Sequence, residues 1–239
     1  MRTFRLSERI RYLWVDSICI NQDDVRERNH QVKKMTEIYA VAVQVLVYLG
    51  EESQNTDTLF SLMRLLICDQ NGVRCESEHV EHFTLYDLIH SKNSQDARWK
   101  EWLDQLLNRR WFGRVWVLQE IVMAQRAILF CGPHSIDWGY FTPSPFKGTT
   151  IKDDHLEAPF PPILRLGKGL ITRAVDFVDL LFATRECVST DPRDKIFALL
   201  DFYKSSAGAA PEADYSKSVE DVFVEATMYC IRSNSDANG

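Results

Sequence analysis

A strand, an amphipathic helix and a second strand follow one another near the start of this chain, and this order constrains the fold more than any other feature. Residues 12–16 and 43–49 are short and largely apolar, and the second run is rich in β-branched side chains. Between them, residues 25–43 carry apolar side chains at helical spacing and charged side chains on the opposite side. A right-handed crossover of this kind joins neighbouring parallel strands. We therefore expect a βαβ unit whose strands are covered on both faces.

The rest of the chain continues this alternation and then becomes helical. Polar residues within 51–95 indicate an insertion, and prolines and glycines punctuate residues 140–169, which we interpret as a linker. The linker would separate an α/β core at residues 1–139 from a helical region at residues 170–239. The apolar spacing predicts one further strand at residues 127–132 and helices at residues 58–68, 96–108, 111–124, 171–184, 192–202 and 218–232. Asp191 stands just before one of them as a candidate N-cap.

Composition places the chain among ordinary globular proteins. Its 239 residues are 45% hydrophobic and 26% charged, which fits one large domain or two small ones. The formal net charge of −6 argues against a nucleic-acid-binding surface. The sequence has neither a signal-peptide core nor 18 consecutive apolar residues. We therefore expect a cytoplasmic protein without a membrane span.

The six cysteines and six histidines form no metal-binding pattern. The cysteines are scattered without CxxC spacing, several lie within apolar runs, and the histidines form neither an HxxxH nor an HExxH motif. We expect buried free thiols in a reducing compartment and no metal site.

Glu120 is the most informative candidate site residue, because it lies in a segment that is otherwise apolar almost all round. Burying a carboxylate without a partner lowers the stability of the fold by roughly several kcal/mol. Glu120 is therefore expected either to pair with an arginine, for which Arg114 and Arg193 are candidates, or to serve a reaction.

Asp16 follows the first predicted strand, where open α/β sheets bind their ligands. Its alternative role is to cap the loop or helix that follows. Asn21 is either a ligand contact or a turn former, and Trp116 either stacks on a base or packs in the core. The tryptophans expected in the core are Trp14, Trp99, Trp102 and Trp111.

Four sequence blocks together resemble the heterokaryon-incompatibility (HET) domain of filamentous fungi. The blocks match the family in order and spacing over about residues 12–202, and they are residues 13–22, 31–50, 110–120 and 190–200. The resemblance implies an effector of programmed cell death in the recognition of non-self. Other proteins of the incompatibility pathway, or a second copy of the chain, would be its partners.

The chain departs from the family at its front. HET domains usually begin with a strand some tens of residues before the block at residues 13–22, and here only eleven residues precede Tyr12. We therefore expect an N-terminally truncated chain that lacks its first strand and a longer C-terminal region. The missing strand would leave one apolar sheet edge exposed, so the isolated chain is expected to aggregate.

A further resemblance concerns the W-x-x-x-E spacing of Trp116 and Glu120. It is similar to that of Toll/interleukin-1-receptor (TIR) domains, whose NAD-cleaving members carry a catalytic glutamate after a tryptophan. This resemblance implies a TIR-like or flavodoxin-like sheet flanked by helices, with an α-rich C-terminal extension. It makes Glu120 the catalytic residue and NAD a substrate rather than a bound cofactor.

Together with the positions discussed above, the Trp116 match completes a set of candidate ligand contacts. These are Asp16, Asn21, Arg114 and Trp116. The opposing hypothesis is a non-catalytic interaction and signalling module, in which the four blocks form core and contact surface. Convergence of Asp16 and Glu120 on one cleft favours the enzyme, and a Glu120 paired with arginine favours the module.

Overall fold

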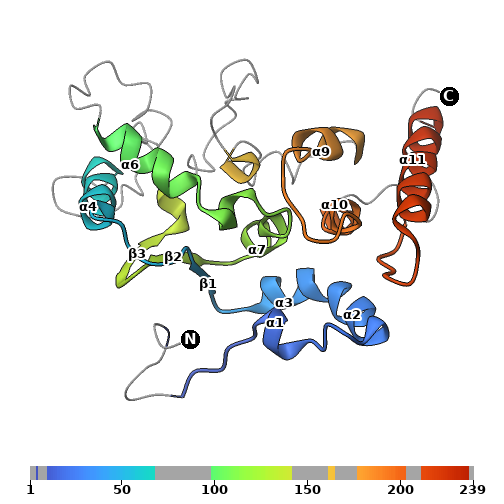
Figure 1. Cartoon of the computed structure of the whole chain (residues 1–239), viewed down its shortest axis with the longest axis horizontal. Helices are drawn as coiled ribbons and strands as arrows, with labels where there is room; N and C mark the ends of the chain where they lie inside the picture. Colours follow the sequence, from blue (N-terminus) through green and yellow to red (C-terminus); the bar gives the residue numbers. More distant parts are fainter. Residues whose placement is uncertain are drawn as a thin grey trace.

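A small mixed sheet surrounded by helices forms the centre of the computed structural model (Figure 1). The structure describes residues 4, 10–67, 98–141, 161–164, 177–202 and 211–236. In Figure 1 the helices of the first 41 residues lie below the sheet, the helices at 56–67 and 98–107 lie to its left and above it, and the helices after residue 176 lie to its right. The predicted α/β class is confirmed.

Three short strands form this sheet in the order β1-β2-β3. They are β1 (Val45–Tyr48), β2 (Ala127–Cys131) and β3 (His134–Asp137). β1 pairs parallel with β2, and β2 pairs antiparallel with β3. The predicted strands at 43–49 and 127–132 are confirmed, whereas β3 was not predicted. The sheet is therefore mixed rather than mainly parallel.

The predicted strand at residues 12–16 is wrong. Residues 10–15 have no regular structure, and a short helix, α1 (Asp16–Cys19), follows at once. Tyr12 is 92% exposed and Ile10 is 84% exposed, so this segment offers no buried face on which a strand could pack. The parallel neighbour of β1 is instead β2, far along the chain.

The helix predicted at residues 25–43 is confirmed but divided. It consists of α2 (Val25–Val32) and α3 (Met35–Val41). The Asp24 carboxylate caps α2 by accepting hydrogen bonds from the backbone N–H groups of Arg26 and Glu27, at 2.9 and 3.2 Å. The chain turns at Lys33 and Lys34 between the two helices.

The helices predicted at residues 58–68 and 96–108 correspond to α4 (Thr56–Ile67) and α6 (Arg98–Leu107). They contact each other, and α4 also packs against β3. α6 buries Trp99, and Trp102 is partly buried against the core. The rest of the predicted insertion, residues 68–95, lies outside the described residues and includes two of the six cysteines.

The single helix predicted at residues 111–124 is wrong. The chain forms a 3₁₀ turn, η2 (Arg110–Gly113), and then a separate short helix, α7 (Val117–Val122). Between them the backbone pairs with Val188: Val115 donates to its carbonyl at 3.1 Å, and Val188 donates to the Gly113 carbonyl at 2.7 Å. A residue that pairs as in a sheet cannot also continue a helix, so the apolar run breaks here.

The C-terminal part is helical, as predicted, with shorter elements. The predicted helix at 192–202 divides into α10 (Asp194–Phe197) and η5 (Leu200–Phe202), and that at 218–232 is α11 (Val219–Asp236). The described elements that complete the chain are η3 (Trp138–Tyr140) and α9 (Phe177–Ala183). Most of the predicted linker at 140–169 lies outside the described residues, so the division into domains stays a prediction.

The two faces of the sheet are covered unequally. Val47, Leu129 and Ile136 lie on the buried face, which packs into the main core. The opposite face is apolar but only partly covered, and Tyr48 on it is 41% exposed. No described strand pairs with the outer edge of β1, so the expected aggregation stays a prediction.

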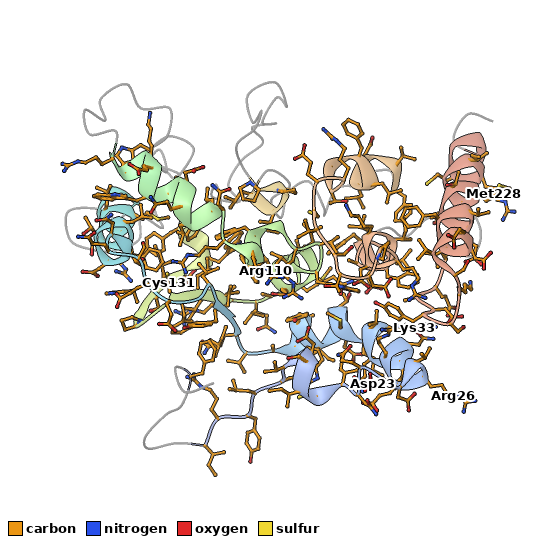
Figure 2. The ribbon with its side chains drawn as sticks, viewed as in Figure 1. Asp23, Arg26, Lys33, Arg110, Cys131 and Met228 are labelled. Carbon is orange, nitrogen blue, oxygen red and sulfur yellow. The ribbon has the colours of Figure 1, made fainter. Side chains whose placement is uncertain are left out.

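Cysteine burial agrees with the expectation at some positions only. Cys131 and Cys187 are buried free thiols and Cys230 is partly buried; Figure 2 shows Cys131 among the side chains of the sheet. Cys19 is exposed, and its predicted burial is wrong because the segment around it is not a strand. No described helix is long and apolar enough to cross a membrane.

Replacing Gly132 by alanine should destabilise the fold. Gly132 has φ +56°, and an added Cβ would lie 2.8 Å from Glu52 Cβ and 2.9 Å from the Glu52 backbone nitrogen. We expect Gly132→Ala to lower the free energy of unfolding by about 2 kcal/mol. Gly113→Ala is the control, because its added Cβ meets only Val188 Cγ2 at 3.8 Å. Urea denaturation of both variants measures the difference, and equal stabilities would contradict the prediction.

Candidate functional site

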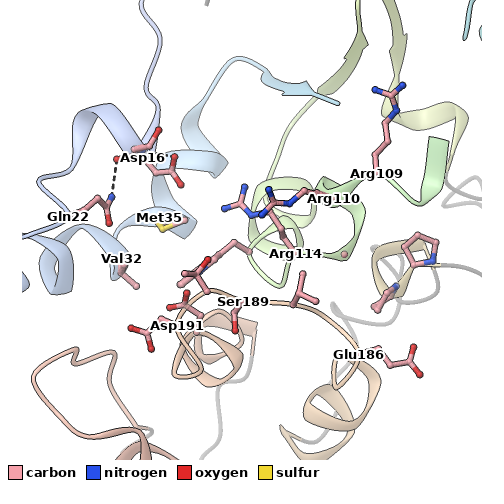
Figure 3. Close-up of a pocket in the computed structure, with 18 of the residues that line it drawn as sticks. Asp16, Gln22, Val32, Met35, Arg109, Arg110, Arg114, Glu186, Ser189 and Asp191 are labelled. Atoms are coloured by element: carbon pink, nitrogen blue, oxygen red, sulfur yellow. Dashed lines mark hydrogen bonds between the residues drawn. The ribbon is translucent and has the colours of Figure 1, made fainter. Parts of the chain in front are cut away.

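A cleft of about 760 Å³ opens beside α1 and α2 and is the candidate site (Figure 3). This volume falls within the range of small-molecule sites. Its walls come from stretches far apart in the sequence, which are residues 16–22, 28–35, 107–116, 161–162 and 186–194, together with Tyr215.

Backbone pairing brings the two longest of these stretches together. The hydrogen bonds of Gly113 and Val115 with Val188 set residues 107–116 against residues 186–194. The buried Gln119 side chain strengthens this arrangement, since its amide donates to the Ala198 carbonyl at 3.2 Å. The cleft is therefore built on paired backbone and not only on side-chain packing.

Three of the predicted ligand contacts, Asp16, Arg114 and Trp116, line this cleft. The Asp16 carboxylate also accepts a hydrogen bond of 2.7 Å from the Ser17 backbone in the first turn of α1. Figure 3 shows Asp16 and Arg114 on elements that face each other across the cleft. The structure brings these residues together, and their contact with a ligand stays a prediction.

Asn21 is not among the residues that line the cleft. Its side-chain oxygen accepts a hydrogen bond of 3.2 Å from the Asp23 backbone, which is the geometry of an Asx turn. The turn-forming alternative therefore describes the observed contact of Asn21.

Glu120 also lies outside the cleft lining, so Asp16 and Glu120 do not converge on one cleft and the arrangement expected to favour the enzyme is not observed. Its carboxylate accepts a hydrogen bond of 2.8 Å from the Trp111 indole. Burial raises the pKa of Glu120, whereas the Trp111 hydrogen bond and the nearby Arg114 charge lower it. Burial, followed by the charges of Glu120 and Asp16, also raises the pKa of Tyr39 far above its ordinary value.

Among the described residues, Glu120 forms no ion pair with an arginine. Arg114 influences it only through space. Arg193, the other expected partner, pairs instead with Asp191 at 2.7 Å. The interaction that satisfies Glu120 is therefore the indole hydrogen bond, which neither of the two sequence-based alternatives includes.

Asp194 is a cleft residue that the sequence did not single out. Its side chain is nearly buried, and it accepts a hydrogen bond of 2.5 Å from the Tyr215 hydroxyl. Burial raises the pKa of Asp194, and hydrogen bonds from the side chains of Tyr215 and Trp116 oppose that rise. In the sequence Asp194 is one of several charges at a helix start, and only the position of Tyr215 reveals its burial.

Arg193 fixes the wall that carries Asp194. Its guanidinium donates to the Asp191 carboxylate at 2.9 and 2.7 Å and to the carbonyls of Tyr215 and Lys217 at 2.8 and 2.6 Å. The hydrogen bonds from Arg193 lower the pKa of Asp191. Because these donors are occupied, Arg193 is a structural residue of the cleft rather than a free ligand contact.

The pKa of Asp194 predicts a specific pH dependence of stability. A carboxyl whose pKa is raised on folding stabilises the fold fully below its unfolded value, 3.8, and this stabilisation is lost as pH rises through the folded value. Asp194→Asn retains a side-chain oxygen that accepts the Tyr215 hydrogen bond, but it has no carboxyl group that gains or loses a proton. The stability of Asp194→Asn relative to the unsubstituted chain should therefore increase with pH above 3.8 and then level off. Urea denaturation across this range measures it, and a pH-independent difference would contradict the assigned pKa direction.

Comparison with known proteins identifies the family. A family model described as "Heterokaryon incompatibility protein (HET)" matches residues 1–120. The chain is 31% identical over 143 residues to "Heterokaryon incompatibility protein 6, OR allele" of Neurospora crassa, which covers 50% of this chain and 20% of that protein. The chain thus spans about a fifth of the length of that curated relative. No solved structure matches it. Because the family model covers half of the sequence, the chain belongs to the heterokaryon-incompatibility (HET) family, as its four sequence blocks predicted.

Proposed function

We propose that this chain is the effector region of a cytoplasmic heterokaryon-incompatibility protein that cleaves NAD in the cleft and so triggers programmed cell death. One observation carries the proposal: Asp16, Arg114 and Trp116, three of the candidate ligand contacts expected from the sequence, line one cleft together with the buried carboxyl Asp194. Carboxylates, an aromatic ring and a guanidinium suit a ribose, a base and a phosphate, respectively.

The proposed reaction is hydrolysis of the bond between nicotinamide and ribose. That bond breaks with its electron pair leaving on nicotinamide, and water adds to the resulting oxocarbenium-like carbon and releases a proton. A carboxylate beside the ribose stabilises the developing positive charge. Trp116 would stack on a base of the dinucleotide, and Arg114 would bind its phosphates.

Asp194 is the carboxyl that we assign to the ribose. It lines the cleft, whereas Glu120 does not and is bound to Trp111. The raised pKa of Asp194 suits a group that exchanges a proton during the reaction. Glu120, the catalytic residue of the TIR-like hypothesis, remains the alternative assignment.

Two isosteric variants test the reaction and the assignment together. We expect the folded chain to release nicotinamide from NAD, and Asp194→Asn to lower kcat about a hundredfold, equivalent to about 3 kcal/mol. Glu120→Gln should retain most activity, because glutamine still accepts the Trp111 hydrogen bond. Asp179→Asn on α9, an exposed carboxylate, is the matched control.

Nicotinamide release and the melting temperature of each variant are measured in parallel. Loss of activity in a folded Glu120→Gln, with Asp194→Asn active, would transfer the catalytic role to Glu120. A folded unsubstituted chain that releases no nicotinamide would eliminate the enzyme and leave the second candidate.

The second candidate is a non-catalytic module that signals by binding proteins of the incompatibility pathway or a second copy of itself. Exposed apolar side chains at one end of the molecule favour it: Tyr12 is 92% exposed and Ile18 is 65% exposed. Apolar groups of this size are costly to leave in water and mark contact surfaces when they cluster.

Replacing these two side chains tests the module. Tyr12→Ser combined with Ile18→Ser should leave the melting temperature unchanged, because neither side chain is buried. If the module is the function, the double variant should abolish killing in a fungal incompatibility assay while nicotinamide release stays the same. Val224→Ser on α11, 62% exposed, is the control. Full killing by the double variant would count against the module.

A further inference from the structure

Arg110 and Arg114 extend into the cleft from the same short stretch of chain (Figure 3). Neither guanidinium forms a hydrogen bond or an ion pair with any residue that the structure describes. Arg109 next to them is different, since it donates to the carbonyls of Leu49 and Glu51 at 2.9 and 2.7 Å. The cleft therefore contains two positive groups with unused donors.

The carboxylates of the cleft are already engaged elsewhere. The Asp191 carboxylate is held by Arg193 at 2.7 Å, and Asp194 is bound by the Tyr215 hydroxyl at 2.5 Å. Asp16 accepts the backbone N–H of Ser17, and Glu186, which also lines the cleft, pairs with Arg185 at 3.6 Å. Glu120 is near enough for Arg114 to lower its pKa, but its carboxylate is bound by Trp111. Two like charges in one cleft repel each other, and a bound anion would relieve this repulsion.

Arg28 on α2 supplies a third guanidinium to the cleft. Its carbon Cζ lies 3.7 Å from the centre of the Tyr215 ring, which fixes the group by a cation–π contact. Its Nε is buried and has no hydrogen-bond partner. A buried donor without a partner is costly, so this nitrogen points to a missing acceptor.

We propose that Arg110, Arg114 and Arg28 form a subsite for the diphosphate group of a nucleotide. A planar guanidinium binds phosphate through two parallel hydrogen bonds, and a diphosphate offers enough oxygens for several such groups. The nucleotide part of this proposal rests on the proposed NAD cleavage, whereas the diphosphate part rests on the three arginines.

Calorimetric titration of the 239-residue chain with inorganic pyrophosphate tests the subsite. Pyrophosphate and ADP-ribose should both bind, and adenosine, which lacks phosphate, should bind far more weakly. Raising the salt concentration should weaken the binding of both anions. Arg110→Gln and Arg114→Gln should each weaken pyrophosphate binding roughly tenfold or more.

Arg26→Gln is the matched control, because it removes the same charge at the outer end of α2, away from Arg110 (Figure 2). All three variants should remain folded, which their melting temperatures without ligand check, because the Arg110 and Arg114 side chains form no hydrogen bond with a described residue. Arg28→Gln extends the series, and its melting temperature reports the contribution of the Tyr215 contact separately.

The outcomes separate this subsite from the proposed reaction. If the folded chain does not bind pyrophosphate, or binds it equally well in the cleft variants and in Arg26→Gln, the subsite is wrong. If pyrophosphate binding depends on Arg110 and Arg114 while no nicotinamide is released, the subsite stands and NAD cleavage fails. If NAD is cleaved with an unchanged KM in both variants, cleavage stands and the subsite fails.

Discussion

Two backbone hydrogen bonds between residues 113–115 and Val188 hold the parts of this molecule in register. They divide the apolar run that follows Arg110 into a 3₁₀ turn and a separate helix. They also place the segment that contains Asp194 opposite the segment that contains Arg114 and Trp116. Side-chain packing tolerates small shifts that paired backbone does not. Without this pairing, the two segments that form the cleft walls would not be held at a fixed position relative to each other.

Side-chain hydrogen bonds extend the same connection into the core. The Gln119 amide approaches Ala198 and Asp201, and the Thr36 hydroxyl donates to Asp201. One carboxylate thus joins α3, α7 and η5, three elements from separate parts of the sequence. The Gln119 side chain is buried, and a buried amide N–H needs an acceptor, so these contacts favour the observed arrangement of the three elements.

The sequence predicted elements better than it predicted how they pair. β1 and β2 were found from their composition, but their parallel pairing joins residues far apart, and no local pattern reveals it. Residues 12–16 resemble a strand, yet no described strand pairs with them, and Tyr12 is exposed while Trp14 packs against Tyr39 of α3. Asp16, Arg114 and Trp116 could be named as candidate ligand contacts from the sequence. Asp194 could not be named in this way. Its burial depends on Tyr215, which the sequence does not link to it.

The position of Arg193 has a consequence for the order in which the molecule is completed. Its guanidinium donates to the carbonyls of Tyr215 and Lys217, so the wall of the cleft depends on residues that are synthesised more than twenty positions after Arg193. Until they dock, Asp194 lacks its tyrosine partner, although Arg110 and Arg114 have already been synthesised. Contacts over such separations form slowly. The wall of the cleft that carries Asp194 is therefore complete only when synthesis has passed Lys217.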